Sequence, residues 1–151
     1  MADGVRLTSN KDALFARLRK LVPGVEAQVG KANLESANEM ASLARGYAPT
    51  GATGKLKASI RIEPGPRVGS YRVLAGGPAT TKSARLGSGK PFDYALGVEF
   101  GTGAHVNAGM FAGSQNPGAR KQPFYWIAYR MMKKRIRSRV TRAINRAIKA
   151  L

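Results

Sequence analysis

Residues 91–105 read PFDYALGVEFGTGAH, and this stretch places a carboxylate beside the most regular apolar pattern of the chain. Tyr94, Leu96, Val98 and Phe100 recur at every second position, which is the period of a strand with one buried face. Glu99 lies on the other side of that predicted strand, just before it stops in the run GTG. The stretch therefore predicts a strand, with an acidic residue near its end.

Outward from this stretch, the sequence predicts helices toward both ends of the chain and two more strands. A helix start with Ser9 as its N-cap precedes apolar residues at helical spacing, and Pro23-Gly24 is expected to end that helix. A second helix is expected over 25–47. Alternating patterns at 55–62 and 71–75 predict two strands that pair antiparallel.

Two glycine-rich segments, 76–90 and 101–120, are predicted to be long loops. A loop of this length in a small domain is usually functional or disordered, and the apolar residues of the second fit a docking loop or a short hairpin. A long helix is expected over 124–151. The fold class is therefore α+β, a single domain over 1–151 with N-terminal helices and a long C-terminal helix packed on a small antiparallel sheet.

Charge is the most unusual property of the chain. Twenty-six Lys and Arg residues face eight Asp and Glu residues, a net charge of +18, and no acidic residue follows Glu99. This balance favours a polyanionic partner, nucleic acid above all, or a basic surface that packs on acidic proteins. In the C-terminal helix the cations form a basic stripe beside an apolar face: Arg135, Arg139, Arg142, Arg146 and Lys149. The stripe is a candidate contact for DNA phosphates or an acidic partner, and equally a solvated helix face.

The sequence offers no constellation for catalysis. Cysteine is absent, which excludes disulfides and thiolate metal sites, and His105 is the only histidine. The run GATGKL at 51–56 has the wrong glycine spacing for a phosphate loop. No apolar run has the length of a membrane span or a signal peptide. We therefore expect a soluble protein without enzymatic activity, metal, cofactor or membrane contact, and a small nuclease with His105 as its base is the enzyme alternative.

Three ordered segments resemble a known family. APTGATGKLKASI at 48–60 is similar to a pattern A-P-x-D-T-G-x-L-x-x-S-I, YALGVEFGT at 94–102 to Y-A-x-x-V-E-F-G-T, and QPF at 122–124 to Q-P-F-x-x-P-A. Together they resemble the tail-completion, or head–tail joining, family of long-tailed double-stranded DNA bacteriophages and related phage-like particles. The chain departs from the pattern at Ala52, where an acidic residue is usual, and at Ile127-Ala128, which replaces Pro-Ala.

The resemblance implies a structural role in the virion, with no catalytic residues. Proteins of this family are small α+β subunits that assemble, typically as a six-fold ring, at the neck between capsid connector and tail tube. The implied partners are other copies, connector or stopper proteins, tail tube or terminator proteins, and double-stranded DNA in the channel. The implied location is the virion neck, reached from the host cytoplasm. A tail terminator or minor tail subunit, and a free-standing sequence-independent nucleic-acid-binding protein, are the alternatives.

The resemblance also implies where copies meet. Residues 76–90 and 101–120 are expected to be assembly loops, and the candidate interface residues are Glu99, Gly101, Thr102, Phe124 and Trp126. Glu99 is expected to pair with an arginine or lysine of its own loop or of the next subunit, while the glycines beside it let the chain leave the sheet. An intramolecular pair that stabilises the sheet is the equal alternative. The aromatic residues around Trp126 are expected to be core or interface anchors, with base stacking as the other reading.

Overall fold

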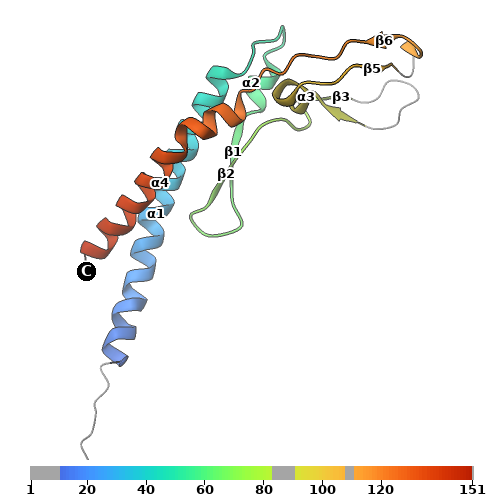
Figure 1. Cartoon of the computed structure of the whole chain (residues 1–151). Coiled ribbons are helices and arrows are strands. Elements are labelled where there is room, and N and C mark those ends of the chain that lie inside the picture. Colours follow the sequence, from blue (N-terminus) through green and yellow to red (C-terminus); the bar gives the residue numbers. More distant parts are fainter. Residues whose placement is uncertain (1–10, 83–90, 108–110, 151) are drawn as a thin grey trace, which may run out of the picture.

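A computed structural model of the chain describes residues 11–82, 91–107 and 111–150, except for the side chains of 11–21. Two long helices, α1 (Lys11–Tyr47) and α4 (Tyr125–Lys149), lie side by side and run in opposite directions (Figure 1). At 1.5 Å per residue they are about 55 Å and about 37 Å long, and α1 extends past the end of α4. The helix pair is therefore the frame on which the rest of the chain is arranged.

Helix α1 continues through Pro23, so the predicted break there was wrong. Proline removes one helix hydrogen bond at a cost of about 3 kcal/mol, but it does not oblige a helix to end. Pro23 and Gly24 are exposed, so the ring of the proline meets solvent, and strong helix formers continue on both sides. The predicted N-cap, Ser9, lies outside the described residues.

Short elements connect the two long helices. In chain order they are α2 (Lys55–Ser59), β1 (Arg61–Pro64), β2 (Tyr71–Leu74), β3 (Thr81–Lys82), β4 (Phe92–Asp93), α3 (Tyr94–Phe100), β5 (His105–Val106) and β6 (Gln115–Asn116). The described strands form three separate antiparallel pairs, β1 with β2, β3 with β4, and β5 with β6. The α+β class is thus confirmed, with three ribbons in place of one sheet. The β5–β6 ribbon projects as an arm away from the helix pair (Figure 1).

Residues 94–100 form a helix, which corrects the predicted strand. The apolar alternation suggested a period of two, but burial follows a period of four: Ala95 and Glu99 are buried, whereas Leu96 and Phe100 are exposed. Asp93 begins this helix, because its side chain accepts a hydrogen bond from the N–H of Ala95 at 2.9 Å. Alanine and glycine between the larger residues are compatible with either period, so the pattern alone misled.

Three other predicted segments differ in part from the structure. The strand expected over 55–62 is the short helix α2 followed by β1, which pairs antiparallel with β2 as predicted. The loop expected over 101–120 carries the hairpin alternative, β5 with β6. The loop expected over 76–90 contains β3, and its residues 83–90 lie outside the described part of the chain.

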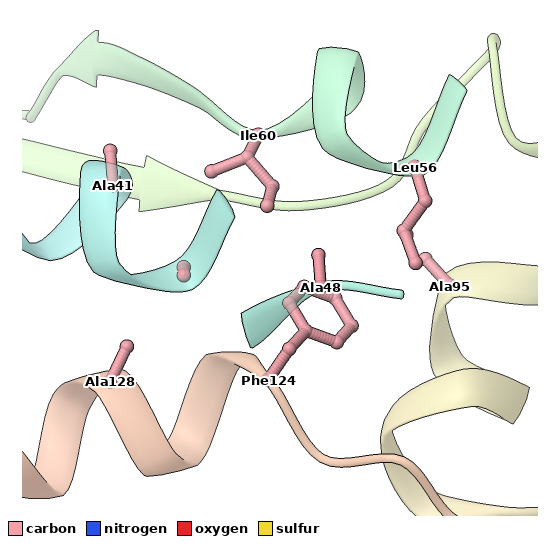
Figure 2. Close-up of a cluster of buried hydrophobic side chains, with 8 residues drawn as sticks. Ala41, Ala48, Leu56, Ile60, Ala95, Phe124 and Ala128 are labelled. Atoms are coloured by element: carbon pink, nitrogen blue, oxygen red, sulfur yellow. The ribbon is translucent and has the colours of Figure 1, made fainter. Parts of the chain in front are cut away.

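The main hydrophobic core lies where the end of α1, α2, α3 and the start of α4 meet (Figure 2). Its buried members are Ala41, Ala44, Ala48, Leu56, Ile60, Ala95, Phe124 and Ala128. Phe124 is 1% exposed and is the largest of them, and the alanines let the two long helices approach closely. All three segments that carry the family resemblance contribute to this core, through Leu56 and Ile60, Ala95, and Phe124 respectively.

Candidate functional site

Glu99 of α3 caps the start of α4. Its Oε2 accepts hydrogen bonds from the backbone N–H groups of Phe124 at 2.8 Å and Tyr125 at 2.9 Å, and its Oε1 accepts one from Trp126 at 3.1 Å. A helix leaves its first N–H groups without internal partners, and its positive end favours a negative charge. No side chain at the N-cap position of α4 supplies a bond. The carboxylate of Glu99, which belongs to α3, therefore supplies the acceptors for the first N–H groups of α4.

This arrangement corrects the roles predicted for Glu99 and Phe124 as interface residues. Glu99 is 6% exposed and Phe124 is 1% exposed, so both are covered by their own chain. Three N–H groups, not an arginine or lysine, meet the charge of Glu99. Burial and the Glu99 carboxylate raise the pKa of Tyr125, whose hydroxyl donates to the carbonyl of Val73 at 2.7 Å. The acidic residue of the 91–105 stretch thus stabilises the fold from within.

Gly101 and Thr102 fix the base of the arm. Gly101 has a φ of +77°, and a Cβ there would lie 2.9 Å from the carbonyl oxygen of Ala119. The N–H of Thr102 donates to the carbonyl of Ala119 at 3.0 Å, and the N–H of Ala119 donates to the Thr102 hydroxyl at 2.8 Å. Gly101 and Thr102 are partly exposed, and Trp126 is 43% exposed, so these three predicted interface residues are accessible to a partner.

An exposed apolar surface lies on α3 and β4, beside the arm. Phe92, Leu96 and Phe100, here called the apolar shelf, are 51%, 61% and 62% exposed. Phe92 also lines a groove of about 880 Å³, together with residues that include Tyr94, Gly97, Val98, Thr102 and Arg120. Clustered apolar side chains that remain in water mark a contact surface. Sequence reasoning missed the shelf because Leu96 and Phe100 were assigned to a buried strand face; a helical projection of the same residues places them together.

The arm carries further exposed apolar side chains. Val106 is 56% exposed and Phe111 is 67% exposed. His105 is also exposed, and its Nδ1 lies 2.9 Å from the carbonyl oxygen of Gly103. Within the described residues, no carboxylate is hydrogen-bonded to His105, so the base of the nuclease alternative has no described orienting partner.

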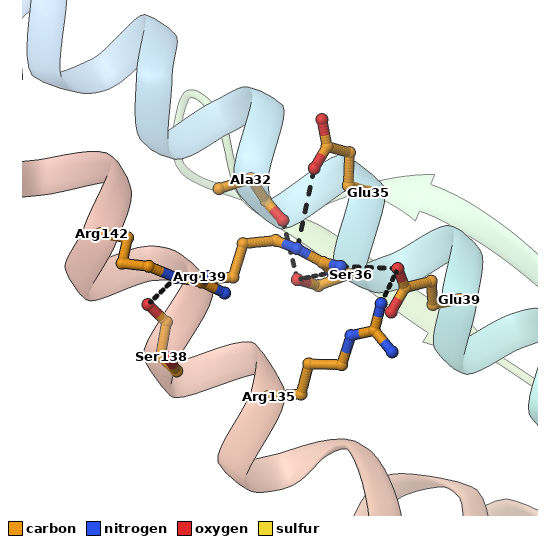
Figure 3. Close-up of polar contacts among 8 residues, drawn as sticks. All are labelled: Ala32, Glu35, Ser36, Glu39, Arg135, Ser138, Arg139 and Arg142. Carbon is orange, nitrogen blue, oxygen red and sulfur yellow. Dashed lines mark hydrogen bonds and ion pairs between the residues drawn. The ribbon is translucent and has the colours of Figure 1, made fainter. Parts of the chain in front are cut away.

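The predicted basic stripe of α4 is divided between two roles (Figure 3). Arg135 and Arg139 face α1, where both pair with Oε1 of Glu39. Arg139 also donates to the hydroxyl of Ser36 at 2.9 Å, and its Nε lies 3.7 Å from a carboxylate oxygen of Glu35. The side chain of Arg139 is only 13% exposed. Both arginines join the long helices. Arg139 is covered, which corrects its assignment to a free surface, whereas the side chain of Arg135 stays 62% exposed.

The rest of the stripe is open. Arg142, Arg146 and Lys149 are exposed, and with Glu35 and Asn145 they line a shallow depression of about 540 Å³. Within the described part of the chain, none of the three is in an ion pair. With Arg135, which is exposed although it is paired with Glu39, four of the five predicted contacts for DNA or an acidic partner are accessible.

Most of the described acidic side chains are bonded to other groups of the same chain. Of the six that the structure describes, five are bonded to arginines or backbone N–H groups: Glu35, Glu39, Glu63, Asp93 and Glu99. Burial favours a higher pKa for Asp93, but hydrogen bonding by the Thr80 side chain and by the N–H groups of Ala95 and Gly77 holds that pKa below its ordinary value. The described surface therefore carries cations that the acidic residues do not neutralise.

Comparisons with known proteins gave no match: no family model, no curated protein and no solved structure matches the chain. Among the described residues, no group of three or more His, Asp or Glu side chains is placed to hold a metal ion. No described helix is both long and apolar enough to cross a membrane. The function is therefore inferred from the surfaces above and from the resemblance of the three segments.

Proposed function

We propose that the chain is a structural subunit of the head–tail interface of a long-tailed bacteriophage or phage-like particle. Copies would form a ring, six-fold in the related family, between the capsid connector and the tail tube, around the DNA channel. The observation that carries the proposal is the meeting of the three family-like segments in one core. Glu99 of the second segment also caps the helix that begins directly after the third. The segments are thus parts of one structural unit.

The accessible surfaces suit assembly. In a closed ring each subunit presents two different faces to its neighbours. The apolar shelf and the groove beside it provide one face, and the arm, with Val106 and Phe111, is placed to reach across to a neighbour. The arm lies within 101–120, one of the two expected assembly loops. A tail terminator or minor tail subunit fits the same surfaces and is the alternative within the particle.

The apolar shelf gives a direct test of this proposal. Particles assembled without the chain would be supplied with wild-type protein or with the double variant Leu96→Glu/Phe100→Glu, and joined head–tail particles would be counted by electron microscopy. Two carboxylates on the shelf should reduce joining by at least tenfold, because burying an unpaired charge costs several kcal/mol. Both residues are exposed, so the variant should fold.

The matched control is Val68→Glu, at a residue that is 86% exposed in the turn between β1 and β2. It adds a carboxylate to an apolar position away from the shelf, so joining should stay at the wild-type level. Normal joining by the shelf variant would contradict the proposed contact. Equal numbers of joined particles with and without any of this chain would contradict the proposed function as a whole.

A further inference from the structure

A second basic surface lies on the outward side of α4, opposite the side that packs on α1. Met132 and Ala143 are buried against the rest of the chain, and from Arg130 to Thr141 the residues on the opposite side of the helix are polar. The exposed apolar residues Met131 and Ile148 lie beside this polar run and beyond its end. We call the outward basic face the set Arg130, Lys133, Lys134, Arg137, Ser138 and Thr141, all of them exposed. Four of its six members are cations. None of these four makes an ion pair or side-chain hydrogen bond within the described residues.

This face was not recognised from sequence because the buried side of α4 was placed wrongly. The predicted basic stripe placed Arg139 on a free surface and did not include Lys133 or Arg137. The structure shows the opposite arrangement, because Arg139 pairs with Glu39 of α1 and Arg137 is exposed. Arg142 adjoins the face and, with Lys133, Lys134, Arg137 and the two hydroxyl residues, lines a depression of about 570 Å³.

The chemistry of the outward basic face fits a polyphosphate backbone better than a protein. Protein–protein interfaces have an apolar centre, whereas interfaces with DNA are polar and positively charged. Six consecutive outward positions of α4 hold cations or hydroxyls, which are the groups that bind phosphate oxygens. From Arg130 to Arg142 the helix rises about 18 Å, a length over which duplex DNA carries about ten phosphates.

We infer that the outward basic face of α4 binds the phosphate backbone of double-stranded DNA, without sequence preference. The inference does not depend on a ring, because every residue of the face belongs to one helix of one chain. It holds for a neck subunit that meets DNA in a channel and for a free-standing DNA-binding protein. The contact is electrostatic and uses no base edge, so it permits DNA to slide.

The test measures the affinity of the isolated chain for a fluorescent 20-base-pair DNA duplex of random sequence. Fluorescence anisotropy reports binding, and the titration is repeated at several salt concentrations. The variant is Lys133→Gln/Lys134→Gln/Arg137→Gln. Its affinity should fall about 100-fold at 0.1 M salt, and the slope of log K against log salt should become shallower by about 2 to 3, because each lost phosphate contact removes about 0.9. Circular dichroism of the variant should match wild type, since the three residues are exposed and unbonded.

The control is Lys55→Gln/Arg67→Gln/Arg72→Gln, which removes three exposed cations elsewhere and gives the same net charge. It should reduce affinity less than fivefold, because long-range charge alone is screened at 0.1 M salt. Equal losses in both triple variants would overturn the inference and show that net charge, not this face, binds DNA. Binding of wild type to acidic polypeptide as tight as to DNA would also overturn the choice of partner. Deleting α4 is not a usable variant, because its buried face holds α1.

Discussion

Glu99→Ala is expected to lower the free energy of unfolding by about 3 kcal/mol. The alanine leaves three N–H groups at the start of α4 without their acceptor, and all three lie in buried or partly buried positions. It also removes a negative charge from the positive end of the helix. In a chain of this length such a loss corresponds to a fall in Tm of about 10 °C, measured by circular dichroism.

Two further variants separate the cap from other effects. Glu99→Gln keeps an oxygen acceptor but turns an amide NH₂ toward at least one N–H group, so it should lose about half as much stability as Glu99→Ala. Glu26→Ala removes an exposed carboxylate of α1 and should change stability by less than about 0.5 kcal/mol. A Glu99→Ala protein as stable as Glu26→Ala would show that the cap of α4 does not stabilise the fold.

Arg139→Ala is the second substitution with a large expected effect. Arg139 is the most covered cation of the predicted stripe and contacts Glu39, Ser36 and Glu35 on α1. Among the described residues, its removal leaves Arg135 as the one cation paired with the Glu39 carboxylate, whose Oε2 is already buried without a described partner. Because Glu39 is partly exposed to solvent, the loss should be about 2 kcal/mol, less than for a fully buried pair. Urea unfolding with one shared m-value measures it.

Arg142→Ala is the matched control for this substitution. Arg142 lies one turn further along α4 and is exposed, and within the described residues its side chain bonds only to the carbonyl of Ser138 in its own helix, at 3.3 Å. Its loss should cost less than about 0.5 kcal/mol. The DNA titration distinguishes the two roles further, since Arg139→Ala should reduce affinity less than any single substitution on the outward basic face. A strong loss of DNA binding with unchanged stability would restore Arg139 to a free surface.

Local signals in the sequence predicted the elements whose partners are close in the chain. The long helix expected over 124–151 has a continuous helical pattern and was predicted correctly. The antiparallel pairing of β1 with β2 across a turn rich in proline and glycine was also predicted, but the strand expected over 55–62 is α2 followed by β1. The seven residues of α3 were wrongly predicted, because so short a helix is fixed by the Asp93 cap and by burial of Ala95 and Glu99 rather than by propensity.

The candidate site depended on contacts between distant residues, which a single sequence does not display. Glu99 meets N–H groups 25 to 27 residues away, and Arg139 meets Glu39 across 100 residues. Every residue except proline has a backbone N–H group, so no residue type in the sequence indicates which N–H groups a carboxylate will bind. The predicted partner of Glu99 was therefore an arginine or lysine side chain, and this prediction was wrong. The side of α4 that packs on α1 was misplaced because an arginine, paired with a carboxylate, takes a half-buried position that a hydrophobic projection assigns to solvent.

The most direct test of the proposed function is a cryo-EM reconstruction of the neck of the particle purified from cells that produce this chain. We expect a closed ring of the chain between the capsid connector and the tail tube, with the apolar shelf of each subunit covered by its neighbour. In such a ring the outward basic face should point toward the DNA channel. A particle that lacks the chain, or holds it away from the neck, would contradict the proposal and leave sequence-independent DNA binding as the function.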